Sequence, residues 1–127
     1  MAVYEKHFTL EEARRELPEL RRLFARILEL VAGLQAEQVE VARIQERIGG
    51  NGHAAHFPDD SSQTQELQSL VAQIMEKGIE IKDLARGLVD FPHLRRGEEV
   101  YLCWLYGEED ILYWHTLEGG FAGRQPL

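Results

Sequence analysis

Residues 9–34, TLEEARRELPELRRLFARILELVAGL, carry the strongest pattern in the chain. Thr9 followed by Glu12 has the form of a capping box, in which each side chain accepts a hydrogen bond from a backbone amide at the start of a helix. Apolar residues then recur at alternating steps of three and four: Leu10, Ala13, Leu17, Leu20, Phe24, Ile27, Val31 and Leu34. This spacing predicts a long amphipathic helix with a heptad-like apolar seam.

The helical pattern extends beyond this stretch and is followed by a second one. The same phase continues through Gln38, Val41, Gln45 and Ile48 until the glycine-rich residues 49–52 end it. Pro18 predicts a kink, or a second helix start, because proline has no amide hydrogen to donate. Apolar residues from Leu67 to Met75 predict a shorter helix that ends at Gly78. We expect the two helices to form an antiparallel hairpin over residues 9–77.

The two predicted helices differ in length, which leaves part of the seam uncovered. At 1.5 Å per residue the first helix spans up to ~60 Å and the second ~28 Å. The sheet or a second copy of the chain must cover the remainder, and the regularity of the seam favours self-association. The partner would be a second copy, giving a homodimer, or another helical protein. The residues of this predicted seam are Leu17, Leu20, Phe24, Ile27, Val31 and Leu34.

After Gly78 the apolar residues recur with period two, which predicts short strands. The clearest pair is 99–106 and 111–116, joined by a four-residue turn, Gly107–Asp110. If Tyr106 faces Ile111, His115 shares a face with Trp104. We therefore expect a single α+β domain over residues 1–127, in which a helical hairpin precedes a small antiparallel sheet of three or four strands and an ordered glycine-rich tail (79–127).

Composition and charge narrow the partners. The net charge of −8 opposes nucleic acid, whose phosphates require a positive surface. No apolar run reaches the ~20 residues that a membrane span needs, and the first residues lack the apolar core of a signal peptide, so we expect a cytoplasmic protein without a membrane partner. Cys103, the single cysteine, lies in an apolar run and is expected to be a buried thiol.

An ordered series of short motifs resembles a known family. The motifs are Phe8-Thr9-Leu10-Glu11-Glu12-Ala13 with Leu17-Pro18, Gly87-Leu88-Val89-Asp90-Phe91-Pro92, Leu102-Cys103-Trp104, Trp114-His115 and residues 120–127, Gly-Phe-Ala-Gly-Arg-Gln-Pro-Leu. Together they resemble the domain-of-unknown-function family 2203, a group of small prokaryotic proteins, over nearly the whole chain. The resemblance implies a whole-domain fold and supplies no catalytic residue.

Two regions offer groups that bind ligands. His53 and His56, followed by two aspartates, have a spacing that fits a divalent metal ion, although histidines in a glycine-rich loop are more often solvated. The C-terminal region offers a possible site for a small anion or a metal ion. Its candidate residues are Asp90, His93, Trp104, Trp114, His115 and Arg124.

Each of these C-terminal residues also has a structural interpretation, which we favour. Asp90 would cap a turn before Pro92, His115 would pack in the sheet with a satisfied ring nitrogen, and Arg124 would pair with Asp90 or Glu108 to hold the tail. No nucleophile or phosphate-binding motif accompanies them, and we expect no cofactor. The sequence thus favours a non-enzymatic assembly module. The alternative is a small-anion or metal-binding protein, with or without an enzymatic activity.

Overall fold

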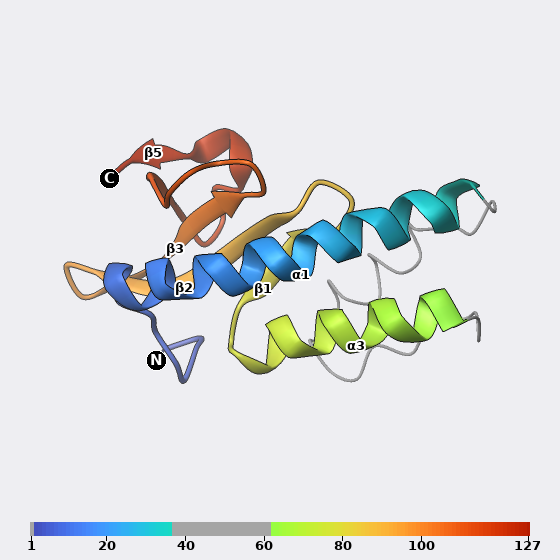
Figure 1. Cartoon of the computed structure of the whole chain (residues 1–127). Helices are drawn as coiled ribbons and strands as arrows, with labels where there is room; N and C mark the ends of the chain where they lie inside the picture. Colours follow the sequence, from blue (N-terminus) through green and yellow to red (C-terminus); the bar gives the residue numbers. More distant parts are fainter. Residues whose placement is uncertain (1, 37–61) are drawn as a thin grey trace.

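The computed structural model describes residues 2–36 and 62–127, and its two described α-helices precede its strands (Figure 1). The helices are α1 (Leu10–Ala36) and α3 (Ser62–Glu76). The strands and a short 3-10 helix follow: β1 (Glu80–Asp83), β2 (Leu88–Arg95), β3 (Glu98–Leu105), β4 (Tyr113–Thr116), η1 (Phe121–Gly123) and β5 (Gln125–Pro126). The five strands form one antiparallel sheet in chain order. The predicted α+β class is confirmed, and the tail adds the fifth strand.

Helix α1 begins at the predicted capping box. The Thr9 amide donates to Glu12 Oε1 over 2.8 Å, and the Glu12 amide donates to Thr9 Oγ1 over 3.1 Å. The helix then runs without interruption through Pro18, which lies on its exposed face. Water can therefore reach the carbonyl that lacks the proline amide as its partner.

The apolar seam of α1 is covered by the rest of the chain. All six seam residues belong to the main hydrophobic core, together with residues of α3 and of the sheet, and none is more than 3% exposed. Phe24, for example, packs against Trp104 with ring centroids 6.5 Å apart. This burial is internal, so the described residues of α1 leave no free apolar stripe for a partner. Self-association through the seam stays a prediction.

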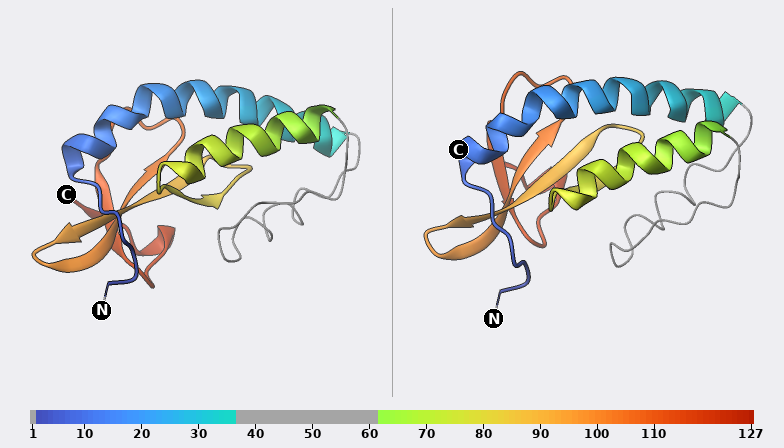
Figure 2. Two further views of the ribbon diagram at one scale, coloured as in Figure 1. Left: turned by 90° about the horizontal axis from the view of Figure 1, so that it is seen from below. Right: turned by 60° about the horizontal axis from the view of Figure 1, so that its bottom comes forward.

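Helix α3 runs antiparallel to α1, and both lie on the same side of the sheet (Figures 1 and 2). Ion pairs flank their contact: Arg26 with Glu66 at 2.6 Å and Lys77 with Glu16 at 3.2 Å. The sheet and α3 together thus cover the part of the predicted seam that the structure describes. Residues 37–61, which include the predicted continuation of that helix, lie outside the described residues.

The chain segments at the two ends cover the other side of the sheet. Figure 2 shows residues 3–8, here called the N-terminal strap, leaving the start of α1 and passing the strands, with η1 on the same far side. The Phe8 amide donates to the Pro92 carbonyl over 2.7 Å, at a part of β2 that lies beyond the end of its pairing with β1. Strand β2 can run through Pro92 because this edge of the strand needs no amide at that position.

The register of β3 with β4 differs from the prediction by one residue. Tyr101 pairs with His115 and Leu102 with Trp114, and β4 begins only at Tyr113. The prediction treated Ile111 as a strand residue, but Ile111 lies in the loop before β4 and is fully buried in the core. A one-residue slip moves every side chain to the opposite face, so His115 lies on the side of the sheet away from the helices.

Gly87 provides a test of how closely the β1–β2 turn approaches β3. Its φ is +75°, and an added Cβ would lie 2.6 Å from the Cβ of Tyr106. Gly97 has a similar φ of +81° and open space around it. We expect Gly87→Ala to lower the free energy of unfolding by about 2–4 kcal/mol and Gly97→Ala by only about 1 kcal/mol, because the first adds a clash to the backbone strain. Urea denaturation measures both, and equal losses would contradict the clash.

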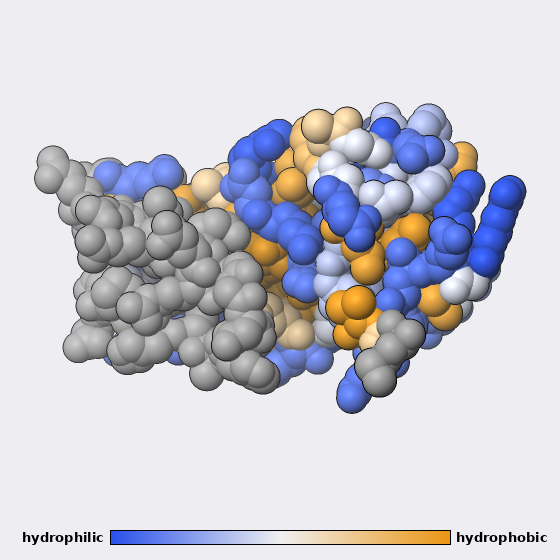
Figure 3. All heavy atoms as spheres, turned by 180° about the vertical axis from the view of Figure 1, so that it is seen from behind, coloured by the Kyte–Doolittle hydropathy of each residue, from blue (hydrophilic) through white to orange (hydrophobic). Residues whose placement is uncertain are grey.

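Neither of the two described helices is both long enough and apolar enough to span a membrane. Viewed from behind, the described surface shows apolar residues in small areas separated by hydrophilic ones (Figure 3).

Candidate functional site

A buried polar cluster lies on the side of the sheet away from the helices. The register places Asp90 of β2 opposite Cys103 of β3, while His115 of β4 lies opposite Tyr101, two residues along β3 on the same face. Asp90, Cys103 and His115 are 2%, 0% and 1% exposed. Buried polar groups at this depth need partners, because water does not solvate them.

Asp90 and His115 form a buried ion pair. His115 Nε2 lies 2.9 Å from Asp90 Oδ1, and His115 Nδ1 lies 2.7 Å from the carbonyl oxygen of Thr116. Burial alone would lower the pKa of His115, but the hydrogen bond and the charge of Asp90 outweigh it and raise that pKa. With an acceptor facing each ring nitrogen, the imidazolium form donates both of its protons.

Cys103 is the third member of the cluster, and its thiol is protonated. Burial, followed by the negative charge of Asp90, raises the pKa of Cys103 to about 12. The Asp90 carboxylate thus acts on both the thiol and the imidazole. A nucleophilic cysteine needs a lowered pKa and an adjacent base. This arrangement therefore does not favour nucleophilic catalysis.

The same three groups are of the types that bind a metal ion, and they lie close together. One ligand atom each from Asp90, Cys103 and His115 lies within 4.8 Å of the other two. In a tetrahedral zinc site with bonds of 2.0–2.3 Å, ligand atoms lie roughly 3.3–3.6 Å apart. The Asp90–His115 pair, at 2.9 Å, would therefore widen slightly around an ion, and the wider separations within the cluster would shorten. The Thr116 carbonyl already holds the Nδ1 side of His115, as backbone carbonyls commonly do for histidine ligands.

Arg124 holds the C-terminal tail beside this cluster. Its Nη2 lies 2.6 Å from Glu108 Oε1, and its guanidinium packs on Tyr113 and Phe121 at 4.1 and 4.6 Å from the ring centroids. The Glu108 pair is one of the two structural pairings expected from the sequence. Nε of Arg124 is buried without an acceptor among the described residues. The contacts fix the guanidinium in place, and an anion would have to displace the Glu108 carboxylate.

The remaining predicted residues lie apart from the cluster. His93 Nδ1 contacts the Phe8 carbonyl at 2.7 Å, within the attachment of the N-terminal strap. Trp104 is fully buried on the helix side and donates its indole N–H to the Glu108 carbonyl, while Trp114 lies beneath the guanidinium of Arg95. His53 and His56 lie outside the described residues. The sequence predicted that Asp90 caps a turn before Pro92. Instead, Asp90 lies within strand β2 and pairs with His115.

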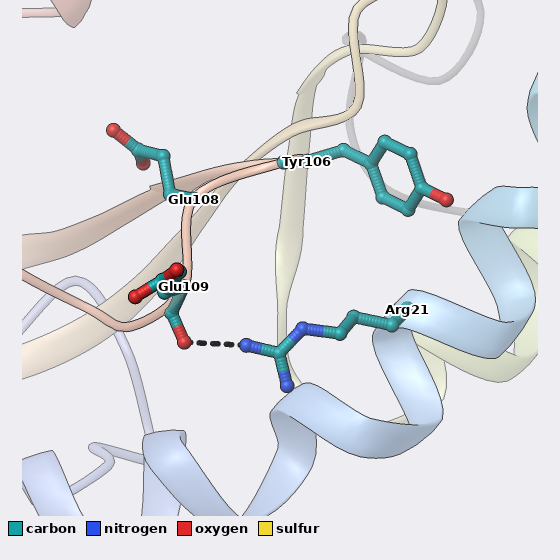
Figure 4. A pocket seen from close by; sticks show the side chains of 5 residues that line it. Arg21, Tyr106, Glu108 and Glu109 are labelled. Atoms are coloured by element: carbon teal, nitrogen blue, oxygen red, sulfur yellow. Dashed lines mark hydrogen bonds between the residues drawn. The ribbon is translucent and has the colours of Figure 1, made fainter.

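Two surface depressions are less suited to a ligand. One, of about 380 Å³, is lined by Arg21 and residues 106–109, and Figure 4 shows Arg21 directed from α1 at the carbonyl of Glu109. That hydrogen bond, of 2.5 Å, joins the helix to the loop. The other, of about 370 Å³, lies beside Arg95, Arg96 and Trp114 and includes the carboxylate of Glu98, which opposes an anion. Neither depression contains a member of the buried cluster.

Comparison with known proteins identifies a family without an assigned activity. The family model described as "Uncharacterized conserved protein (DUF2203)" matches residues 6–127. No curated protein and no solved structure matches the chain.

Proposed function

The chain belongs to the uncharacterised DUF2203 family, and we propose that the protein binds a transition-metal ion of the zinc type through Asp90, Cys103 and His115. The observation that supports the proposal is the convergence of a carboxylate, a thiol and an imidazole from three neighbouring strands in a fully buried place. This is the metal-binding alternative from the sequence, with a different set of ligands.

The ligand types favour zinc or a related ion over calcium or magnesium. Sulfur and imidazole nitrogen suit zinc, whereas calcium and magnesium take oxygen ligands. An incoming cation would replace the proton of the Cys103 thiol and the second proton of His115, so binding would release protons. The ion would tie β2, β3 and β4 together and stabilise the sheet.

Binding is tested by titrating the metal-free protein with Zn²⁺ and, in parallel, with Co²⁺. We expect one ion per chain by calorimetry, and an absorption band from the thiolate–cobalt bond that Cys103→Ser removes. Each of Asp90→Asn, Cys103→Ser and His115→Gln is expected to weaken binding by at least about 100-fold, because losing even an outer partner of a ligand costs 10- to 100-fold.

Two matched controls locate the ion. Glu98→Gln removes an exposed carboxylate at the start of β3, five residues from Cys103, and is expected to bind as the wild type does. The double variant His53→Gln/His56→Gln removes the pair of histidines that the sequence suggested. Binding that survives the three cluster substitutions but is lost in the double variant would contradict the proposal and place the ion in residues 53–56.

The assembly role that the sequence favoured remains a second proposal. It is supported by the length and regularity of the helical pattern, whereas the internal burial of the seam leaves no free apolar stripe for a partner among the described residues of α1. Sedimentation at several protein concentrations tests its self-association part, and a monomer at the highest concentration would contradict that part.

A further inference from the structure

One carboxylate of the sheet, that of Glu99, holds three residues of the N-terminal strap. Glu99 of β3 accepts hydrogen bonds from the amides of Val3 at 2.7 Å and Tyr4 at 3.0 Å, and contacts Nε2 of His7 at 2.8 Å. The side chain of Glu99 is 14% exposed. The two backbone hydrogen bonds and then His7 lower the pKa of Glu99 to about 2, so this carboxylate is ionised at neutral pH.

Tyr4 of the strap packs on Tyr101, which lies beside the buried cluster. Its hydroxyl donates to Glu80 Oε1 at 2.6 Å and meets the hydroxyl of Tyr101. The ring of Tyr4 packs edge-on against the ring of Tyr101, with centroids 5.8 Å apart. The ring of Tyr101 in turn lies 5.3 Å from that of His115. The strap therefore packs on Tyr101, whose ring borders His115 of the cluster on the far side of the sheet.

The other cover of the far side is held in a different way. The C-terminal tail pairs with β4 as strand β5, and Arg124 adds its contacts to Glu108 and to two aromatic rings. The first part of the strap, residues 3–7, is fastened mainly through side chains. Segments without strand pairing open more readily than paired strands do. Opening is thus expected on the strap side.

We infer that the N-terminal strap is a door over the Asp90, Cys103 and His115 cluster, and that the Glu99 carboxylate is its latch. When the latch releases, residues 3–7 move off Tyr101, and solvent or an ion reaches the cluster from that side. The passage of an ion rests on the proposed metal-binding function, but the access of solvent to Cys103 does not.

The reactivity of Cys103, the single cysteine, measures the door directly. Iodoacetamide is applied to the full-length, metal-free protein at one fixed alkaline pH, and the alkylation rate is followed by mass spectrometry. Glu99→Gln keeps the shape of the latch but removes its charge, and we expect alkylation to be at least about tenfold faster, because the rate follows the population of the open form. Glu98→Gln makes the same chemical change one residue away and is expected to stay within about twofold of the wild type.

A second variant and a urea series separate a door from general unfolding. Tyr4→Phe removes the hydroxyl contacts with Glu80 and Tyr101 and is also expected to raise the rate. If the strap opens locally, the rate in Glu99→Gln depends only weakly on low urea concentrations, since little surface is exposed. A rate equal to that of Glu98→Gln, or a urea dependence as steep as that of global unfolding, would overturn the inference.

Zinc kinetics distinguish failure of the door from failure of the metal site. If both hold, Glu99→Gln binds Zn²⁺ and releases it faster by similar factors, and its affinity stays near that of the wild type. If zinc does not bind but Glu99→Gln is alkylated faster, the door stands and the metal proposal falls. If zinc binds but neither alkylation nor zinc binding is accelerated, the door falls.

Discussion

Asp90→Leu is expected to lower the free energy of unfolding of the metal-free protein by about 3–5 kcal/mol, as breaking one side of a buried ion pair does. The substitution leaves the imidazole of His115 buried at 1% exposure, with its Nε2 deprived of an acceptor. The cost combines the loss of a charge-assisted hydrogen bond with the desolvation of the remaining polar group. Urea denaturation at about pH 6 measures it, below the ordinary histidine pKa of about 6.5.

The double variant Asp90→Leu/His115→Phe separates the pair from its surroundings. Replacing both members with apolar groups is expected to recover most of the loss, because neither charge is then left unpaired. The exposed pair of Arg14 and Asp110, whose side chains are each 42% exposed, serves as the control. Asp110→Ala should cost less than about 1 kcal/mol. A cost of that size for Asp90→Leu would show that the buried pair contributes little.

The pH dependence of this difference has a defined sign. The pKa of His115 is raised in the folded protein, so the stabilisation from the pair is fully present below the unfolded pKa of about 6.5 and is lost as the pH rises through the folded value. As the pH rises through the folded pKa of His115, the wild type should therefore lose free energy of unfolding relative to the double variant.

The helical part of the fold was predictable because its signals are local. The capping box at Thr9 and the apolar spacing of α1 depend on residues three or four apart, and both are confirmed. The cover of the seam was not predictable in the same way. It depends on Phe24 meeting Trp104, residues far apart in the chain, and helical spacing does not distinguish an internal partner from an external one.

The cluster was only partly predictable, because it depends on strand register. Asp90 and His115 were both candidates, but the expected turn at Gly107–Asp110 placed His115 on the wrong face. The loop is instead held by tertiary contacts: Glu108 accepts the indole N–H of Trp104, and Arg14 pairs with Asp110. The alternation of apolar residues along the strands gives no indication of these contacts with α1 and with the Trp104 ring.

One signal for Cys103 was present in the sequence. Arg96 and Gly97 form a two-residue turn between β2 and β3, and both have positive φ, as such hairpin turns require. Glycine at the second position is the usual mark of this turn. Counting back from it places Asp90 opposite Cys103, which is the pairing observed. The third ligand candidate was therefore accessible from turn chemistry, although the arginine at the first position weakens the motif.

Phe24→Ala is expected to lower the free energy of unfolding by about 3–5 kcal/mol, as for other large-to-small substitutions of buried phenylalanine. Phe24 is fully buried and contacts both Trp104 and Tyr106, with ring centroids 6.5 and 6.4 Å away. Ala25 provides the adjacent exposed position, where substitution by serine should cost less than about 1 kcal/mol.

The concentration dependence of the Phe24→Ala effect decides between the two covers of the seam. If the chain's own sheet covers Phe24, the urea midpoints of the wild type and the variant do not change with protein concentration, because unfolding is unimolecular. If a second copy contributes to the cover, both midpoints rise with concentration, since association stabilises the folded form by mass action. Urea midpoints measured over a roughly hundredfold range of protein concentration therefore distinguish cover of the seam by a second copy from cover by the chain's own core.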